Sequence, residues 1–286
     1  MKIKKAILPI AGDSTRFLPF SKAAGKHFLP LGEKPILQIL IEECVAAGVD
    51  EIILIKNPAD EITEKYFSRD ESLEKILKSK NKLEILREVS KLENLAKIHF
   101  VEQNSPRGDG DAILRAEKFF SKSENFLTLF CDEVFFGENE KSATRQLLEN
   151  FENEILIALC EVSKSEIENF GVAKIDENSG AILNLVEKPR ARNAPSNLAI
   201  VGKYILNFEI FAALKNGENS ADGELRIIDG LRFLLQKGEK IFGKILRGAR
   251  FDTGSKLGFF KANFATAIDD EKIRDEFLKF VRKFKI

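Results

Sequence analysis

Histidine and cysteine are scarce in this chain of 286 residues. The two histidines, His27 and His99, have no metal-ligand spacing to each other or to a cysteine, which argues against a zinc site. Two histidines and no Gly-x-Ser-x-Gly motif also leave little scope for a hydrolytic triad. The three cysteines, Cys44, Cys131 and Cys160, are odd in number and far apart, so we expect buried, reduced thiols.

Net charge and long apolar runs are absent as well. The 45 basic and 45 acidic residues cancel, which leaves no electrostatic footprint for nucleic acid or an anionic membrane. No apolar run approaches the roughly 20 residues of a membrane helix, and the N-terminus leads into a strand without a signal peptide. We therefore expect a cytoplasmic protein whose partners are neither nucleic acids nor membranes, and any cationic site must be local.

Alternating apolar segments are what the chain does contain. Strands are expected at 5–9 and 51–55 with a helix at 34–47 between them, which is the βαβ unit of a parallel sheet. Three later strand-like runs lack intervening helices and should add antiparallel pairs, at 169–175, 182–188 and 198–205. The pattern predicts an α/β fold with a Rossmann-like, mixed, mainly parallel sheet and helices on both faces.

A cation-rich turn follows the first strand. The small residues Ala11 and Gly12 can lay backbone N–H groups against a phosphate, and Arg16 adds a planar fork of donors. Lys22 and Lys26 supply further positive charge, so we expect this loop to bind an anion. The dinucleotide fingerprint and the nucleoside triphosphatase loop are both absent, and a plain basic surface loop is the alternative.

Two aspartates stand where a magnesium site could form. Asp132 follows the apolar strand expected at 126–131, and Asp252 lies just before Gly254 and a predicted helix. A hard divalent ion prefers oxygen ligands beside substrate phosphates, so Asp132 and Asp252 could face each other across a pocket. For Asp132, a helix cap or a turn is the structural alternative.

The loop and its surroundings resemble a known family. Residues 5–35 are similar to the signature A-G-x-G-T-R-x-L-P-x-T-K-x-x-P-K-E-M-L-P of bacterial UTP:glucose-1-phosphate uridylyltransferases, which are sugar nucleotidylyltransferases. Further family motifs occur in the same order at 186–189, 194–204 and 252–254. The resemblance covers nearly the whole chain. It implies the nucleotide-diphospho-sugar transferase fold and Mg²⁺-dependent transfer of a uridylyl group from UTP to glucose 1-phosphate.

With 286 residues, of which 44% are hydrophobic, the chain can bury the core of one large α/β domain or of two small ones, and we favour one. We expect one domain over residues 1–286, with a nucleotide half at about 1–135 and a sugar half at about 136–255. The C-terminal helices would then occupy about 256–286.

Site roles follow from the same resemblance. It implies that Arg16 and Lys26 hold the triphosphate, and that Gln103 and Gly108 read uracil. A side-chain amide has a donor and an acceptor that can match the imide edge of a pyrimidine. Without the resemblance, Gln103 would be an ordinary turn residue.

The sugar side of the site is implied by the motif at 186–189. There, Gly171 and Glu187 would hold the sugar, since a carboxylate accepts hydrogen bonds from vicinal hydroxyls. Lys188 would bind the sugar phosphate from the opposite face of the strand. A solvated Glu-Lys surface pair is the alternative.

The chain departs from the family pattern at Asp13, Ser14, Gly25 and His27, and residues 107–111 read Arg-Gly-Asp-Gly-Asp where the family has Lys-Gly-Leu-Gly-His. A Cβ at Ser14 narrows the approach of a phosphate, and Asp13 repels it.

Two alternatives to the uridylyltransferase therefore stay open. One is a sister enzyme with another sugar 1-phosphate or pyrimidine triphosphate, and the other is a non-catalytic paralogue that binds a sugar nucleotide.

Two apolar stripes suggest self-association. One runs through the helical segment at 73–89, and the other consists of the phenylalanines in the amphipathic tail at 269–286. Either stripe would leave a large apolar patch in water, so we predict a homodimer or homotetramer. A solvated helical pair is the alternative for residues 73–89.

Overall fold

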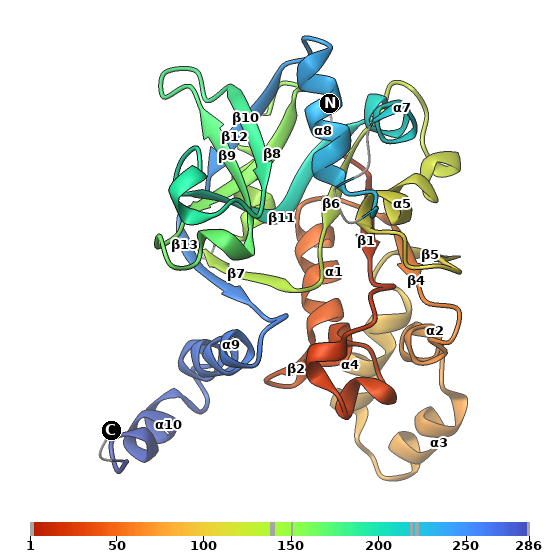
Figure 1. Cartoon of the computed structure of the whole chain (residues 1–286). Helices are drawn as coiled ribbons and strands as arrows, with labels where there is room; N and C mark the ends of the chain where they lie inside the picture. Colours follow the sequence, from red (N-terminus) through yellow and green to blue (C-terminus); the bar gives the residue numbers. More distant parts are fainter. Residues whose placement is uncertain (1–2, 138–140, 150, 218–219, 221–222, 285–286) are drawn as a thin grey trace.

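The computed structural model describes the chain over residues 3–137, 141–149, 151–217, 220 and 223–284 (Figure 1). A mixed β-sheet with helices on both faces forms its centre (Figure 1).

Parallel strands from the N-terminal half form one side of this sheet. They are β1 (Lys5–Pro9), β4 (Glu51–Lys56), β5 (Lys97–Glu102) and β6 (Asn125–Leu129). β1 lies between β4 and β6, and β5 follows β4. Because parallel strands end at the same edge, the loops after β1, β5 and β6 gather there, which is where open α/β sheets bind ligands.

Later strands complete the sheet with mostly antiparallel pairs. β11 (Leu198–Asn207) pairs with β6 and so joins the two parts of the chain, and it also pairs with β8 (Ile155–Glu161) and β9 (Gly171–Ile175). β10 (Ile182–Glu187) extends from β9, and β12 (Ile241–Ile245) runs parallel to β8. In the described part of the chain these strands make one nine-stranded mixed sheet, which confirms the predicted α/β fold.

The two faces of the sheet bury separate apolar cores. α1 (Ile36–Ala46) and α6 (Ala143–Leu148) pack on one face. α5 (Asp109–Leu114), α7 (Glu209–Asn216) and α8 (Ile227–Gln236) pack on the other. Alternate residues of β1 belong to different cores, with Leu8 in the first and Ile7 in the second, as the pleat of a strand requires.

A second, small ladder was not predicted from the sequence. β7 (Glu133–Gly137) pairs antiparallel with β13 (Gly248–Asp252), and α6 and α7 were also missed. Each strand carries a charged residue that pairs with the other strand, Glu133 on β7 and Arg250 on β13. Only three apolar residues follow Glu133 in β7, and Arg250 divides the apolar residues of β13. The three cysteines are buried and free, as expected.

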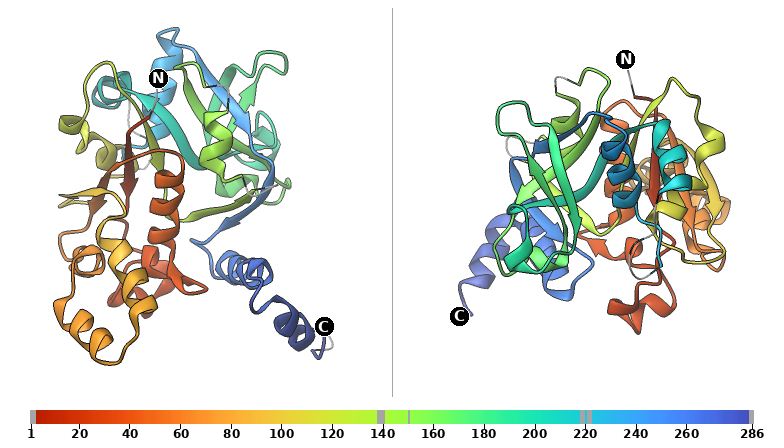
Figure 2. Two further views of the ribbon diagram at one scale, coloured as in Figure 1. Left: turned by 180° about the vertical axis from the view of Figure 1, so that it is seen from behind. Right: turned by 45° about the horizontal axis from the view of Figure 1, so that its top comes forward.

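The remaining helices lie at the periphery. They are α2 (Ile62–Phe67), α3 (Glu71–Ser79), α4 (Leu83–Glu93), α9 (Lys256–Asp269) and α10 (Arg274–Val281). α9 and α10 extend away from the sheet (Figures 1 and 2). Apolar side chains are exposed on these helices, among them Leu73, Ile76, Leu83, Ile85, Leu257, Phe260, Phe264 and Phe280. No helix among the described residues is both long and apolar enough to cross a membrane.

A buried ion pair fixes α1 to the sheet. Lys203 on β11 is fully buried, and its Nζ lies 3.0 Å from Oε2 of Glu43 on α1. The other carboxylate oxygen of Glu43 accepts the backbone N–H of Thr144 at 2.8 Å, so α6 is held as well. The pair therefore links α1, α6 and β11 inside one core.

Lys203→Met should lower the free energy of unfolding by about 3–5 kcal/mol, because it leaves the carboxylate of Glu43 buried without its counter-charge. Adding Glu43→Gln should recover most of this loss, since the amide oxygen can still accept from Thr144. Urea denaturation of both variants measures the effect. A double variant no more stable than Lys203→Met would contradict this account.

Candidate active site

Residues from distant parts of the chain line one cavity of about 740 Å³ beside the carboxyl ends of β1 and β6. Six of the residues predicted for the site lie on its wall: Arg16, Asp132, Gly171, Glu187, Lys188 and Asp252. The fold thus brings together the phosphate loop, both proposed metal ligands and the proposed sugar-binding residues.

The two aspartates face a common space. β7 begins directly after Asp132 and pairs with β13, which ends at Asp252, and Thr253 donates its N–H to the Asp132 carbonyl at 2.8 Å. A Cβ added to Gly254 would lie 3.0 Å from Asp252 Oδ1 and 3.4 Å from Asp132 Oδ2. The glycine thus leaves open the space between two carboxylates. Hard oxygen donors around such a space fit a divalent ion.

Protein ligands alone do not complete a metal site here. In the described ranges, no three or more His, Cys, Asp or Glu residues form a group that could hold a metal ion. Two carboxylates with room for substrate oxygens are the arrangement expected where phosphates supply the remaining ligands.

Lys26 contacts one of these aspartates directly. Its Nζ lies 2.5 Å from Asp132 Oδ2. Burial raises the pKa of Asp132, but the Lys26 ammonium outweighs this and holds that pKa below its usual value. For Lys26, burial lowers the pKa, and the charge of Asp132 overcomes it so that the pKa is raised. Both groups are therefore charged at neutral pH, and each neutralises the other.

Glu187 and Lys188 lie on the same side of the chain, contrary to the expected alternation. β10 ends at Glu187, and Lys188 has a φ of 42°, so the strand geometry does not continue. The Lys188 Nζ lies 3.6 Å from Glu187 Oε1, and both residues line the cavity. Gly171 opposes them on β9, where an added Cβ would be 3.1 Å from Glu187 Oε2. A Cβ here would make the carboxylate shift by a few tenths of an ångström, so glycine favours its position against β9.

The turn after β5 holds Gln103 and Gly108. The side-chain amide nitrogen of Gln103 donates to the Gly108 carbonyl at 3.1 Å and to Asp111 Oδ2 at 2.7 Å. Gly108 has a φ of +103°, and a Cβ there would lie 2.2 Å from the Leu225 carbonyl oxygen. The packing of this turn against the segment just before α8 therefore requires a glycine at position 108. In the side-chain amide of Gln103, the oxygen is the atom that is left to bind a ligand.

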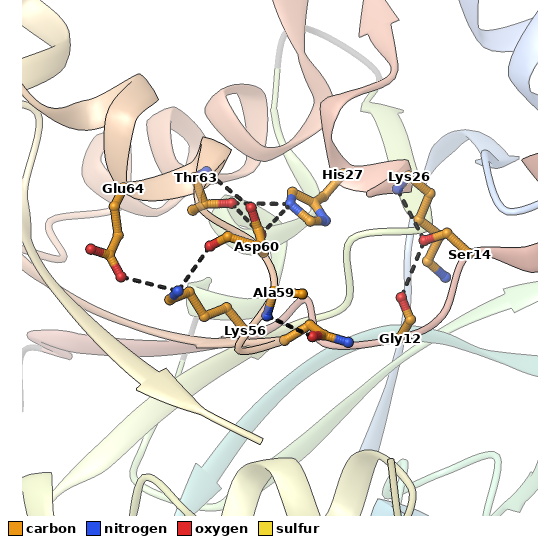
Figure 3. Close-up of polar contacts among 10 residues, drawn as sticks. Gly12, Ser14, Lys26, His27, Lys56, Ala59, Asp60, Thr63 and Glu64 are labelled. Carbon is orange, nitrogen blue, oxygen red and sulfur yellow. Dashed lines mark hydrogen bonds and ion pairs between the residues drawn. The ribbon is translucent and has the colours of Figure 1, made fainter. Parts of the chain in front are cut away.

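Ala11 and Gly12 begin the phosphate loop. Ala11 is buried, whereas Gly12 is exposed and an added Cβ would meet nothing within 4 Å, so its backbone is open to a ligand. Gly12 also lines a second, smaller cavity of about 180 Å³ together with Ser14 and Lys22. Close contacts within the loop are drawn in Figure 3.

A salt bridge that sequence reasoning missed supports the carboxylate pair. Arg250 donates through Nε to Glu133 Oε2 at 2.6 Å and also contacts Glu133 Oε1. Its guanidinium lies over the Phe170 ring, 4.0 Å from the centroid. The sequence did offer one indication that Arg250 belongs to the site. Arg250 stands two residues before Asp252, and residues two apart lie on the same face of a strand.

Asp109 is a half-buried acid on the cavity wall. Its Oδ1 accepts the N–H of Ile227 at 2.6 Å, which ties the turn to α8. Burial, together with the charges of Glu187 and Asp132, raises the pKa of Asp109 to about 7, against the opposing effect of the Ile227 hydrogen bond. The folded protein therefore keeps a proton on this group at a pH where the unfolded chain has lost it.

Asp109→Asn should stabilise the protein in a pH-dependent way. Because the folded-state pKa is raised from 3.8 to about 7, the wild type loses stability as the pH rises through this window, and the amide does not. We expect the melting temperature of the variant to exceed that of the wild type by several degrees at pH 8 and by much less at pH 5. Asp275→Asn on exposed α10 is the matched control, and equal differences at both pH values would refute the assignment.

Known proteins resemble this chain in sequence and in fold. The nucleotidyl transferase family model matches residues 5–268. A UTP–glucose-1-phosphate uridylyltransferase of Mycoplasma pneumoniae is 40% identical over 291 residues, covering 99% of each chain. The UTP-bound UGPase of Acinetobacter baumannii has a TM-score of 0.90 at 29% identity, covering 99% of this chain and 100% of that one. A UDP-glucose pyrophosphorylase complexed with UDP-glucose has a TM-score of 0.82 at 30% identity, covering 94% and 100%. This chain therefore belongs to the nucleotidyl transferase family.

Proposed function

We propose that this protein transfers the uridylyl group of UTP to glucose 1-phosphate, giving UDP-glucose and pyrophosphate. The observation that carries the proposal is the single cavity that gathers Arg16, the Asp132 and Asp252 carboxylates, and the Glu187–Lys188 pair. The similar proteins named for this reaction, one of them bound to UTP and one to UDP-glucose, support the choice of substrates. UTP and glucose 1-phosphate are cytoplasmic metabolites, so the proposal also implies a cytoplasmic enzyme.

The reaction needs positioning more than covalent catalysis. A sugar phosphate has a second pKa of about 6, so its oxygen is largely ionised at neutral pH and can attack without a general base. The oxygen forms a bond to the α-phosphorus of UTP, and the bond to the β-phosphate oxygen breaks as pyrophosphate leaves. The protein supplies alignment and positive charge for the phosphates.

Cationic side chains divide this task. Arg16 and Lys26 would bind the triphosphate, and Lys188 would bind the sugar phosphate beside Glu187, which accepts from sugar hydroxyls. Lys26 pairs with Asp132 in the structure, so it exchanges that carboxylate for a phosphate when substrate binds. Gly171 gives Glu187 the room to face the sugar.

Uracil would be read by the turn after β5. Both hydrogens of the Gln103 amide are directed at protein acceptors, so its carbonyl can accept the N3–H of uracil. Cytosine presents an acceptor at N3 and would be disfavoured. The backbone of Gly108, held in place by α8, and that of Ala11 and Gly12 would complete the nucleotide site.

A divalent ion is generally used by enzymes of this family, and we propose Mg²⁺. Asp132 and Asp252 would hold it, because their oxygens face the space left open by Gly254. When bound, the ion would offset negative charge on the transferred phosphate.

The test of the proposed function is an assay that crosses four nucleoside triphosphates with several sugar 1-phosphates and follows pyrophosphate release. We expect the highest kcat/KM with UTP and glucose 1-phosphate. A higher value with another pair would identify a sister enzyme. Binding of UDP-glucose, seen as a rise in melting temperature, without turnover of any pair would identify a non-catalytic paralogue.

Asp132→Asn and Asp252→Asn should each lower turnover at limiting magnesium by at least about 100-fold, because each removes a charged ligand without changing side-chain volume. The melting temperature of Asp252→Asn should change little, whereas that of Asp132→Asn should fall, because Lys26 loses its counter-charge. Asp275→Asn serves as the control for the same substitution outside the site. Near wild-type activity of either variant at limiting magnesium would show that its aspartate is not a ligand.

We also propose a homodimer or homotetramer. Phe280 on α10 and Ile85 on α4 are 55% and 49% exposed, so both candidate surfaces present apolar side chains to water. Light scattering should report a dimer or tetramer at micromolar concentration. Phe280→Glu should lower the mass if the C-terminal tail forms the interface, and Ile85→Glu should do so if α3 and α4 form it. A monomeric wild type would refute self-association.

A further inference from the structure

Ser14 occupies a strained position in the phosphate loop. Its backbone is left-handed, with φ 53° and ψ 29°, a conformation that favours glycine. The hydroxyl donates to the Gly12 carbonyl at 3.2 Å and accepts the backbone N–H of Lys26 at 3.0 Å (Figure 3). The serine side chain therefore bridges the two sides of the loop, which glycine could not do.

His27, the next residue after Lys26, is anchored on its other side. The imidazole is 2% exposed, and its Nε2 lies 3.1 Å from Thr63 Oγ1 and 3.2 Å from Asp60 Oδ2 (Figure 3). The Thr63 hydroxyl donates its proton to Asp60 Oδ2 at 2.6 Å, so it can only accept from the ring. Nε2 therefore carries the proton.

The anchor itself is fixed to the central sheet. Lys56, at the end of β4, is buried and donates from Nζ to the Asp60 carbonyl at 2.8 Å (Figure 3). Burial raises the pKa of the Asp60 carboxyl, but the hydrogen bonds from His27 and Thr63 outweigh it and lower that pKa to about 2. His27 is thus bound to a charged group that does not move freely.

Gly25 makes room for the histidine. A Cβ at this position would lie 2.4 Å from Cε1 and 2.7 Å from Nδ1 of the His27 ring. Any other residue at position 25 would displace the ring or the loop. The identity of residue 25 and the packing of residue 27 therefore depend on each other.

We propose that Ser14, Gly25 and His27 act as one positioning unit that sets the place of Lys26 for the triphosphate. The inference rests on the proposed function and explains why these positions differ together from the family signature. Ser14 holds the Lys26 N–H, His27 fixes the following residue to Asp60 and Thr63, and Gly25 admits the ring. The Lys26 side chain then reaches Oδ2 of Asp132, which lines the cavity, at 2.5 Å.

Loss of this positioning should have a measurable effect on the reaction rate. A displacement of about 1 Å at a group that contacts the reacting phosphates can lower the rate by about 100-fold. We therefore expect His27→Ala to lower kcat about 10- to 100-fold while KM for glucose 1-phosphate changes less than about twofold. His27→Gln keeps a donor near the position of Nε2 and should recover most of the loss.

Substitutions that change the charge at His27 and Asp60 provide a second test. His27→Glu would place a carboxylate against Asp60 and should lower kcat more than His27→Gln does. Adding Asp60→Lys reverses the pair and should restore part of the activity. His99→Gln, at the other histidine, which lies on β5 outside the cavity, is the matched control and should leave kcat unchanged.

The glycine and the serine are tested in the same assay. Gly25→Ala should lower kcat in the wild type but add little to His27→Ala, because the collision with the ring is then gone. Ser14→Gly relieves the left-handed backbone, so the melting temperature should hold or rise while kcat falls. A loss of activity that followed only a loss of stability would overturn the proposal for Ser14.

If Ser14 and His27 act by positioning Lys26, the effect of replacing them should depend on the presence of Lys26. A general structural role would not show this dependence. In a Lys26→Ala background, His27→Ala and Ser14→Gly should lower kcat less than about twofold further, because the group they position is absent. Equal fold losses in both backgrounds would overturn the inference.

The wild type is assayed first, so that the proposed function is judged separately. If it turns over no substrate pair, that function fails, and the dissociation constant of Mg²⁺–UTP from calorimetry replaces kcat. Non-additive losses between His27→Ala and Lys26→Ala would then support the positioning unit, and additive losses would overturn it.

Discussion

The pairing of β7 with β13 is the constraint on which the site depends. Asp132 and Asp252 are far apart in the sequence, and only this ladder makes them neighbours. The Glu133–Arg250 salt bridge closes the ladder from within, since both side chains are mostly buried and each neutralises the charge of the other. A hydrogen-bonded ladder with an internal ion pair fixes both carboxylates more firmly than loops could. The sheet, the phosphate loop and α9 are all positioned relative to it.

Much of the fold could be predicted because it is encoded locally. β1, α1 and β4 have apolar spacings that leave one interpretation, and the ends of parallel strands must gather at one edge. That Asp132 and Asp252 could face each other was expected from the place of Asp252 just before Gly254 and a helix, and from the family motifs. β7 and β13 were not predicted, because both are short: β7 has only three apolar residues after Glu133, and Arg250 divides the apolar residues of β13.

Side-chain contacts were the least predictable part of the site. Residue types indicated that Lys26 and Asp132 belong to it, but not that they contact each other. The direction of Lys188 was wrong because β10 stops one residue earlier than the pattern indicated. His27 was excluded as a zinc ligand, yet its ring is packed against Gly25 and bonded to α2, a role that depends on three-dimensional distances.

The contact between Lys26 and Asp132 has a thermodynamic consequence for the free site. An anion that binds Lys26 leaves the Asp132 carboxylate unpaired, and a cation that binds Asp132 leaves the Lys26 ammonium unpaired. Either ion alone must therefore compete with the Lys26–Asp132 ion pair. When both ions bind, neither Lys26 nor Asp132 is left unpaired. By thermodynamic linkage, each ion raises the affinity for the other by the same factor. On the proposed assignment, a free phosphate or a free metal ion would therefore be held weakly, and the two together would be held well.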